Sequence, residues 1–363
     1  MKRLCIIFQE KVAEHDFGPG HPVKSKERLY GYLDRLRELG LSDLPQVSLI
    51  DSAREVSDED ILTVHESSLL ELIKSLSKEG GILDGDTPLP QGTYERAKLQ
   101  VGGFLDGAQA VLEDKFDRSV QVPAFGGHHA MRRHGYTTFG FCYLHEQGIV
   151  VRYLQRQKYI EKALILDTDC HHGNGTQDIF YNDPTVLTIS LHQDPHTIYP
   201  GVMGFADETG EGRGKGFNVN VPLPPRTGCQ SYMKALSETF PPLASEFQPD
   251  IILAVLGGDT HFQEPLTNFG LGLDCYQEIA NVVVSTANDL CRGKVLSTVS
   301  GGRNLISGPF IACESTASLL EYGPLQQVDP YGEPSNEPSG IEQEVERTLI
   351  EVKRNLSPYW RCF

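Results

Sequence analysis

Residues 165–176 read ILDTDCHHGNGT, and the interpretation of the whole chain starts from this stretch. An apolar run ends at Leu166, and two aspartates and two histidines follow within six positions. A short run rich in Ile and Leu is typical of a strand that is covered on both faces of a parallel sheet. Ligands in such folds bind beyond the carboxyl ends of the strands. The stretch therefore predicts a parallel sheet with a polar site at this edge.

Other segments extend the same pattern along the chain. Apolar runs at residues 4–8, 186–191, 251–256 and 295–299 are further strand candidates, and residues 26–39, 94–112 and 275–290 have helical spacing, the last with Asp274 as its expected N-cap. Alternating strands and helices predict an α/β fold with a parallel sheet and helices on both faces. We expect a single domain over residues 1–363, in which 324–339 form a proline-rich loop and 340–363 a terminal helix and tail.

Composition excludes several classes of function. The chain has 363 residues and a formal net charge of −17, which argues against a nucleic-acid partner. We expect no membrane partner, because no apolar run approaches membrane length, and the opening MKRLCIIFQE is too short in apolar residues for a signal peptide. The eight cysteines are scattered without a C-x-x-C pair, which predicts reduced thiols in a cytoplasmic protein.

Polar groups follow four of the apolar segments. Gly126-Gly127-His128-His129 follows the run that ends at Phe125, and Gly257-Gly258-Asp259 follows residues 251–256. Gly301-Gly302-Arg303 follows residues 295–299. The fourth set is residues 167–172, which follow the apolar run that ends at Leu166. Glycine permits sharp turns and close backbone approach. We therefore expect all four sets to meet at one edge of the sheet.

Asp169, His171 and Asp259 form a candidate metal site. In an extended segment, residues i and i+2 point the same way, so Asp169 and His171 can converge while Asp259 reaches them from a neighbouring strand. Two carboxylates and one imidazole leave a fourth position open, which is typical of a catalytic zinc site. The alternative is that these side chains form a buried cluster of ion pairs and hydrogen bonds at the strand ends, without a metal ion.

His128 and His129 are candidate proton-transfer groups. Hydrolysis at a metal site needs a base for the attacking water and an acid for the leaving group, and two histidines in different environments supply both. Asp167 could orient one ring and Asn174 the other. A hydrogen-bonded loop without a catalytic role is the alternative.

Three motifs carry a resemblance to a known family: GGHHAMRRHGYTTFGFCYLH, DTDCHHGNGTQDIFYNDPTVLTISLH and GGDTHFQEPLTNFGLG. Together they resemble the zinc-dependent histone deacetylase superfamily, which includes acetylpolyamine amidohydrolases and acetoin-utilisation proteins. The resemblance runs from about Gly20 to about Gly302. It implies the arginase/deacetylase fold, one domain with an eight-stranded parallel sheet.

The resemblance also implies site roles and a substrate. Asp169, His171 and Asp259 would bind Zn²⁺, and His128 and His129 would act as base and acid, with Asp167 as the partner of His128. The remaining implied roles are a tunnel wall (Phe141 and Tyr199), a grip on the substrate backbone at the rim (Asp86) and a structural K⁺ site (Asp167, Ser190 and the backbone near Leu191). The implied substrate is an acylated amine, either acetyl-lysine or an acetylpolyamine.

Arg303 departs from the family pattern. The family has a tyrosine here, whose hydroxyl helps to polarise the scissile carbonyl. Arginine is longer, and its guanidinium group is permanently charged and carries several N–H donors. Arg303 could replace the tyrosine as an oxyanion donor, bind a substrate carboxylate or pair with an acidic residue. The sequence leaves these three roles open.

Three functions follow from these observations. The leading hypothesis is a zinc-dependent amidohydrolase that removes an acyl group, with Arg303 in the tyrosine's place. The alternative is a catalytically weak or inactive acyl-lysine-binding protein. A two-metal ureohydrolase of the arginase type is disfavoured, because two aspartates of its pattern fall at Gly173 and His261. The sequence indicates no oligomeric state.

Overall fold

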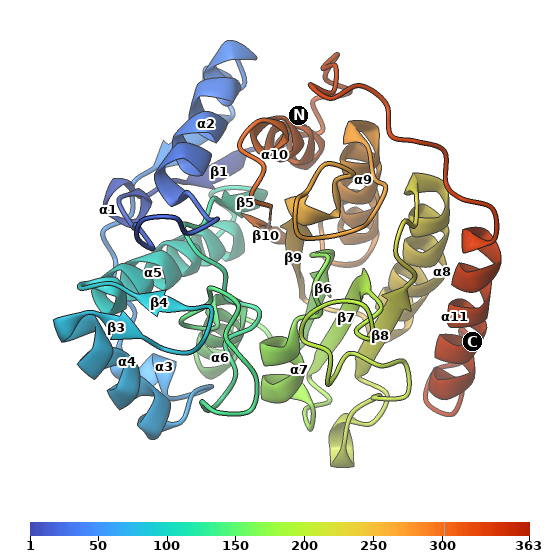
Figure 1. The fold of residues 1–363 in the computed structure, drawn as a ribbon, viewed down its shortest axis with the longest axis horizontal. Helices are drawn as coiled ribbons and strands as arrows, with labels where there is room; N and C mark the ends of the chain where they lie inside the picture. The colour runs from blue at the N-terminus through green and yellow to red at the C-terminus, as the bar shows by residue number, and fades with distance from the viewer. Residues whose placement is uncertain (301) are drawn as a thin grey trace.

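The centre of the molecule is an eight-stranded sheet in which every strand is parallel to its neighbours (Figure 1). The computed structural model describes residues 1–300 and 302–363. The strands are β1 (Leu4–Ile7), β2 (Val47–Ile50), β5 (Arg118–Gln121), β6 (Ala163–Asp167), β7 (Val186–Gln193), β8 (Asn218–Leu223), β9 (Ile251–Gly257) and β10 (Val295–Ser300). Their order is β2-β1-β5-β10-β9-β6-β7-β8, and β3 (Gly81–Ile82) and β4 (Pro88–Leu89) form a separate small hairpin. The predicted α/β fold with an eight-stranded parallel sheet is confirmed.

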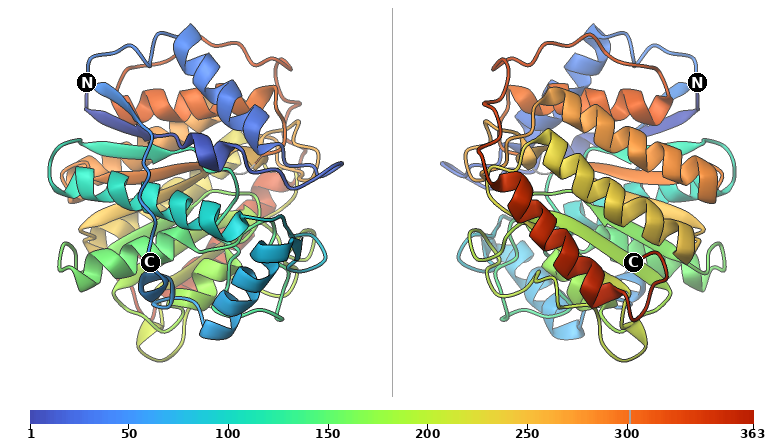
Figure 2. Two further views of the ribbon diagram at one scale, coloured as in Figure 1. Left: turned by 90° about the vertical axis from the view of Figure 1, so that its left-hand side faces the viewer. Right: turned by 90° about the vertical axis from the view of Figure 1, so that its right-hand side faces the viewer.

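Helices cover both faces of this sheet. They are α1 (Glu10–Ala13), α2 (Ser25–Glu38), α3 (Asp58–Ile61), α4 (Ser67–Glu79), α5 (Thr93–Leu112), α6 (Glu146–Arg156), α7 (Asn174–Phe180), α8 (Cys229–Phe247), α9 (Leu273–Leu290), α10 (Ser307–Leu320) and α11 (Ile341–Leu356), with 3-10 turns η1 (Gly212–Gly214) and η2 (Gly258–Thr260). Figure 2 shows α8, α9 and α11 side by side on one face and α5 on the opposite face. Among the described residues, no helix combines the length and apolar character needed to cross a membrane.

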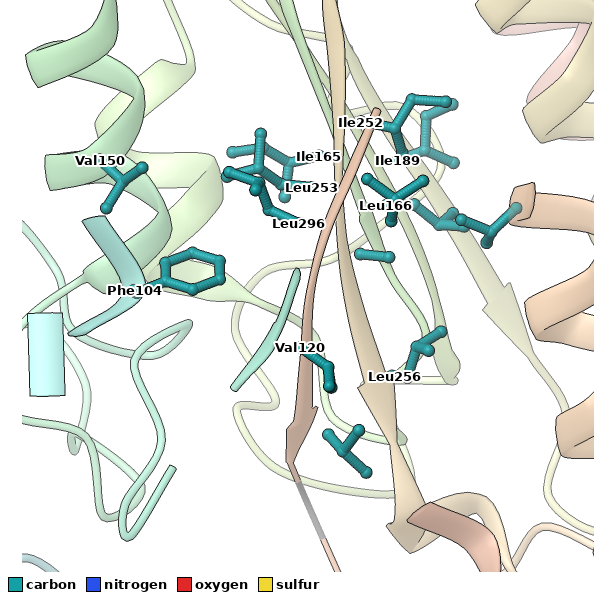
Figure 3. Packing of buried hydrophobic residues seen from close by; sticks show 14 of the residues in the cluster. Phe104, Val120, Val150, Ile165, Leu166, Ile189, Ile252, Leu253, Leu256 and Leu296 are labelled. Carbon is teal, nitrogen blue, oxygen red and sulfur yellow. The ribbon is translucent and has the colours of Figure 1, made fainter. Parts of the chain in front are cut away.

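The core lies on both sides of the central strands. Ile165 of β6, Leu253 of β9 and Leu296 of β10 are register partners and point together toward the side of α5 and α6, where Phe104 and Val150 lie (Figure 3). Leu166 and Ile252 point to the opposite side (Figure 3). Successive side chains of a strand alternate between faces, so continuous apolar runs are needed where both faces are covered.

Some elements differ from the sequence prediction. Strands β2, β5 and β8 were not among the predicted runs, because polar residues interrupt them: β5 reads RSVQ, yet all four of its residues are buried.

Asp274 was predicted as the N-cap of a helix that starts at residue 275, and this is wrong. Helix α9 begins at Leu273 with Gly272 at the N-cap, so Asp274 lies inside the first turn, where its charge still favours the helix N-terminus.

The prediction that the cysteines are reduced is wrong for one pair. Cys229 and Cys275 form a disulfide that joins the first turns of α8 and α9. The two residues are separated by 46 positions, and only the packing of α8 beside α9 brings them together. The other six cysteines are free, and five of these are buried.

Candidate active site

Four adjacent strands deliver the candidate site residues. Strands β5, β10, β9 and β6 are neighbours in the sheet, and all run in one direction, so the segments that follow them leave from the same edge. These segments carry the histidine pair, Arg303, Asp259, and Asp169 with His171, respectively, and Asp167 is the last residue of β6. The arrangement expected from the sequence is therefore present.

Asp169, His171 and Asp259 converge on one point. Each offers a ligand atom within 4.8 Å of the others, and all three side chains are buried. The Nδ1 atom of His171 lies 3.1 Å from Asp169 Oδ1 and 2.9 Å from Asp259 Oδ2. Ligand atoms around a tetrahedral zinc ion lie roughly 3.3 Å apart, given metal–ligand distances of about 2.0–2.1 Å. The donor set and its spacing therefore fit a divalent ion with an open coordination position.

The backbone reaches this geometry by bending rather than by extension. Strand β6 ends at Asp167, so the extended spacing expected for Asp169 and His171 is wrong. Instead, Asp169 N–H donates to Asp167 Oδ1 at 3.0 Å, and His171 N–H donates to Asp169 Oδ1 at 2.9 Å. A Cβ atom on Gly257 would lie 2.4 Å from the Asp169 Cα, so glycine at this position allows the close approach that brings Asp259 to the other two side chains.

His128 and His129 have different partners, as expected. His128 Nδ1 lies 2.8 Å from Asp167 Oδ2, and His129 Nδ1 lies 2.6 Å from Asn174 Oδ1. The two rings are 3.9 Å apart between centroids, and both are buried. Since their Nδ1 atoms are engaged, the Nε2 atoms are the ring atoms available to a substrate.

Electrostatics separate the two histidines. Burial alone would lower the pKa of His128, but the charges of Asp167 and Asp169 outweigh it and raise the pKa to about 9. Burial, together with the charges of His128 and His171, holds the pKa of His129 well below its ordinary value. The pair thus combines one ring that retains a proton with one that is neutral. A bound divalent cation would lower both pKa values, because like charges repel.

A cavity of about 50 Å³ lies against these groups. Its walls include both histidines and the three candidate metal ligands. Phe125, Phe141 and Cys142 are among its apolar neighbours, and Arg28, Gly302 and Arg303 also line it. Arg28 comes from α2, and no feature of the sequence distinguished it from other helix-surface arginines. The residues that could act on a substrate thus share one small, half-apolar space.

Arg303 points to an acidic residue that the sequence analysis did not single out. The carboxylate of Glu264 accepts hydrogen bonds from the backbone N–H of Arg303 at 2.8 Å and of Asn304 at 3.3 Å, and its other oxygen lies 3.4 Å from Arg303 Nη1. Glu264 is fully buried, and the Arg303 guanidinium lies 5.1 Å from the centroid of the Phe141 ring. Glu264 lies five residues after Asp259 in the motif GGDTHFQEPLTNFGLG. Its position in this motif is the sequence feature that could have indicated a place near the site.

Comparisons with known proteins agree with this geometry. The family model described as "Histone deacetylase domain" matches residues 21–319. The chain belongs to the histone deacetylase family. It is 36% identical to a "Probable deacetylase" of Archaeoglobus fulgidus over 99% of both chains. It is 34% identical to a "Histone deacetylase-like amidohydrolase" of Pseudomonas aeruginosa, covering 85% of this chain and 84% of that one.

Further histone deacetylase relatives extend the comparison. The acetoin utilization protein AcuC of Bacillus subtilis is 30% identical over 84% of this chain and 79% of its own. The crystal structure of the HDA15 HD domain superposes with a TM-score of 0.85 at 26% identity, covering 100% of this chain and 97% of that one. Relatives named as deacetylases and amidohydrolases support a hydrolase that removes acyl groups from amines.

The histone deacetylase resemblance also implied substrate-binding roles for Phe141, Tyr199 and Asp86, and only Phe141 is among the described side chains that line the cavity. Phe141 lines the cavity, whereas Tyr199 is not among the described side chains that line it. The Tyr199 ring lies 4.9 Å from His129 and 6.2 Å from His171 between centroids, and its hydroxyl donates to Thr138 O. Asp86 accepts hydrogen bonds from the hydroxyls of Thr87 at 2.7 Å and Thr138 at 2.9 Å, and so braces the loop that precedes Phe141.

The residues expected to hold potassium lie together. Asp167 of β6 and Ser190 of β7 are register partners, and Leu191 follows Ser190. Asp167 and Ser190 also line a second, smaller cavity with Asn218 and Asn220.

Proposed function

We propose that this chain is a zinc-dependent amidohydrolase that removes an acyl group, in the simplest case acetyl, from the amine of a lysine or polyamine. The convergence of Asp169, His171 and Asp259 beside two differently partnered histidines carries this proposal. Family membership supports the same class of reaction. When bound, the metal ion would supply Lewis-acid chemistry, polarising the amide carbonyl and lowering the pKa of water.

The protein's own residues would perform the proton transfers. His128 and His129 would take the proton from the attacking water and deliver one to the leaving amine through their Nε2 atoms. Asp167 would hold His128 in one tautomer and Asn174 would do so for His129. Phe125 and Phe141 would exclude water from the reacting amide. A potassium ion near Asp167, Ser190 and Leu191 would stabilise the strand ends that hold these groups.

A slow or inactive acyl-lysine-binding protein is the second candidate. It is favoured by one observation: Arg303 stands where the family tyrosine would be, and it pairs with Glu264. In the hydrolase, Arg303 acts as a charged donor to the bound substrate instead of the neutral hydroxyl.

Metal content and acetate release test the proposal together. We expect the zinc-loaded protein to release acetate from an acetyl-lysine peptide or an acetylpolyamine, and chelation to abolish release. Asp259→Asn should lose both zinc and activity, whereas His129→Ala should keep zinc and lose about 10²–10⁴-fold in rate. Asp289→Asn, an exposed aspartate on α9, is the control. A zinc-loaded wild-type protein without turnover would favour the binding protein, and equal turnover by His129→Ala would contradict the assigned role.

A further inference from the structure

Two guanidinium groups line the cavity that holds the candidate metal ligands. Arg28 comes from α2 and Arg303 from the segment after β10, so they enter from different elements. The carboxylates of this site already have partners. Asp167 bonds to His128, while Asp169 and Asp259 belong to the metal triad. Glu264 is therefore the acidic side chain that remains for the two cations.

Glu264 uses little of the hydrogen-bonding capacity of Arg303. One of its oxygens is occupied by two backbone N–H groups, and the other contacts Nη1 at 3.4 Å, a long distance for a charged pair. The Nε atom of Arg303 is buried and has no hydrogen-bond partner within residues 1–300 and 302–363. Because the guanidinium carries five N–H donors, most of them remain available in a largely buried position.

Arg28 also has a guanidinium donor without a hydrogen-bond partner among the described residues. Its Nη2 atom donates to the backbone oxygens of Pro123 at 2.6 Å and Ala124 at 3.2 Å, and its Nε atom is buried without a partner in the described part of the chain. Burial and the charge of Arg303 lower the pKa of Arg28 to about 10, although Glu264 and Asp169 oppose this shift. Both guanidinium groups line the same cavity, so their positive charges repel each other.

An anion would relieve this arrangement. Burying a charged group without a partner is unfavourable, and a planar guanidinium matches a carboxylate better than any other common anion except phosphate. The cavity of about 50 Å³ is small, so it suits a short group. A carboxylate near Arg303 and Arg28 would satisfy their free donors within the space where the scissile amide is expected.

We propose, on the basis of the proposed amidohydrolase function, that Arg303 and Arg28 select a short acyl group that itself ends in a carboxylate, such as malonyl or succinyl. Water adds to the amide carbon and the C–N bond breaks. The amine leaves as a cationic ammonium after it takes a proton, and the acyl group leaves as a dicarboxylate. Charge and atoms balance, because a monoanionic amide and water give one cation and one dianion.

The test compares acyl groups that differ only in charge. Zinc-loaded protein is assayed with lysine peptides that carry succinyl or its neutral isostere succinamoyl, malonyl or malonamoyl, and acetyl. We expect kcat/KM to be about 10–100-fold higher for each charged acyl group than for its isostere, the range of one charge-assisted hydrogen bond. Arg303→Met should abolish this difference, Arg303→Lys should retain part of it, and Arg347→Met, an exposed arginine on α11, should leave it unchanged.

A binding measurement adds a readout that does not depend on turnover. By calorimetry, succinate should bind the zinc-loaded protein about 10-fold more tightly than succinamate, and Arg303→Met should remove this preference. Equal or faster turnover of the neutral acyl groups by the wild type would overturn the inference and leave the amidohydrolase intact. A preference for a carboxylate on the amine side, such as N-acetyl-γ-aminobutyrate over N-acetylbutylamine, would also overturn it. Absence of turnover with every peptide would instead count against the amidohydrolase.

Discussion

At the scale of single residues, the histidine pair depends on a buried carboxyl group that does not line the cavity. Glu146 is 1% exposed and accepts hydrogen bonds from Gln100 at 2.8 Å and Gln147 at 3.2 Å. Gln100 also donates to Phe125 O and accepts from Ala124 N–H, so it fixes the chain just before the histidines. Burial raises the pKa of Glu146 from its ordinary value of 4.5 to about 7, although the two amides oppose this shift.

This shift predicts a pH-dependent stability. Below pH 4.5 the Glu146 carboxyl is neutral in both the folded and unfolded states. Between pH 4.5 and about 7 the unfolded chain releases the proton and the folded chain keeps it, so the free energy of unfolding falls as pH rises. The loss reaches on the order of 3 kcal/mol at pH 8. Glu146→Gln should therefore be nearly neutral at pH 4.5 and stabilising at pH 8.

Urea unfolding at both pH values checks this prediction. Glu344→Gln, an exposed glutamate on α11, serves as the control and should change the free energy of unfolding by less than about 0.5 kcal/mol at either pH. A Glu146→Gln protein that is equally or more destabilised at pH 8 than at pH 4.5 would show that the buried carboxyl is ionised and favourable.

At the scale of elements, α8 and α9 support the loop that carries Asp259. The Tyr276 hydroxyl on α9 lies 2.9 Å from Thr260 Oγ1 and 3.3 Å from Gly258 O, the residues on either side of Asp259. Cys275 precedes Tyr276 and is bonded to Cys229 at the start of α8. The backbone of Gly270 donates to Thr227 O at 2.9 Å, which ties the same loop to the residues before α8. The disulfide therefore fixes the two helix starts beside the candidate metal ligand.

Removing this disulfide should lower stability substantially. A cross-link between residues 46 positions apart restricts the unfolded chain by about 4 kcal/mol in the chain-entropy model. The double variant Cys229→Ser, Cys275→Ser should lose about this much free energy of unfolding in denaturant titrations without reductant. Dithiothreitol should destabilise the wild type but not the double variant. Cys362→Ser, at an exposed free cysteine, should behave as the wild type in both conditions.

At the scale of the whole molecule, α11 covers the end of the sheet. It packs against β8, the edge strand, and against α8, and it lies beyond residue 319, where the family match ends. Its buried face comprises Ile341, Val345, Leu349, Val352 and Leu356. Trp360, just after the helix, donates from Nε1 to Gly216 O at 2.7 Å. This C-terminal helix is therefore part of the packed structure and not an appendage.

Two neighbouring residues of α11 allow a matched test of this packing. Leu349 is 1% exposed and Ile350 is 59% exposed. Leu349→Ala should lower the free energy of unfolding by about 2–5 kcal/mol, because it removes buried apolar volume. Ile350→Ala should change it by less than about 0.5 kcal/mol. Equal effects at the two positions in denaturant titrations would mean that α11 does not pack on the sheet as described.

The sequence by itself determined the type of fold and the chemical groups of the candidate site. Apolar runs such as residues 163–166 must be buried on both faces, and the polar groups after them must lie at the carboxyl edge, so His128, Asp169 and Asp259 could be named in advance. Their local partners, Asp167 and Asn174, were also within reach of short-range reasoning. Strands β5 and β8 were not, because their polar residues are buried by tertiary contacts that no local pattern encodes.

Only the tertiary structure decided which strands are neighbours and which distant groups meet. The order β5-β10-β9-β6 joins segments that are far apart in the chain, and no local property of a strand specifies its neighbour. The same holds for the Cys229–Cys275 bond and for Glu264 and Arg28 beside Arg303. A side chain's type and position along the chain fix what it can bind, but the distance to its partner depends on how the whole sheet and its helices pack.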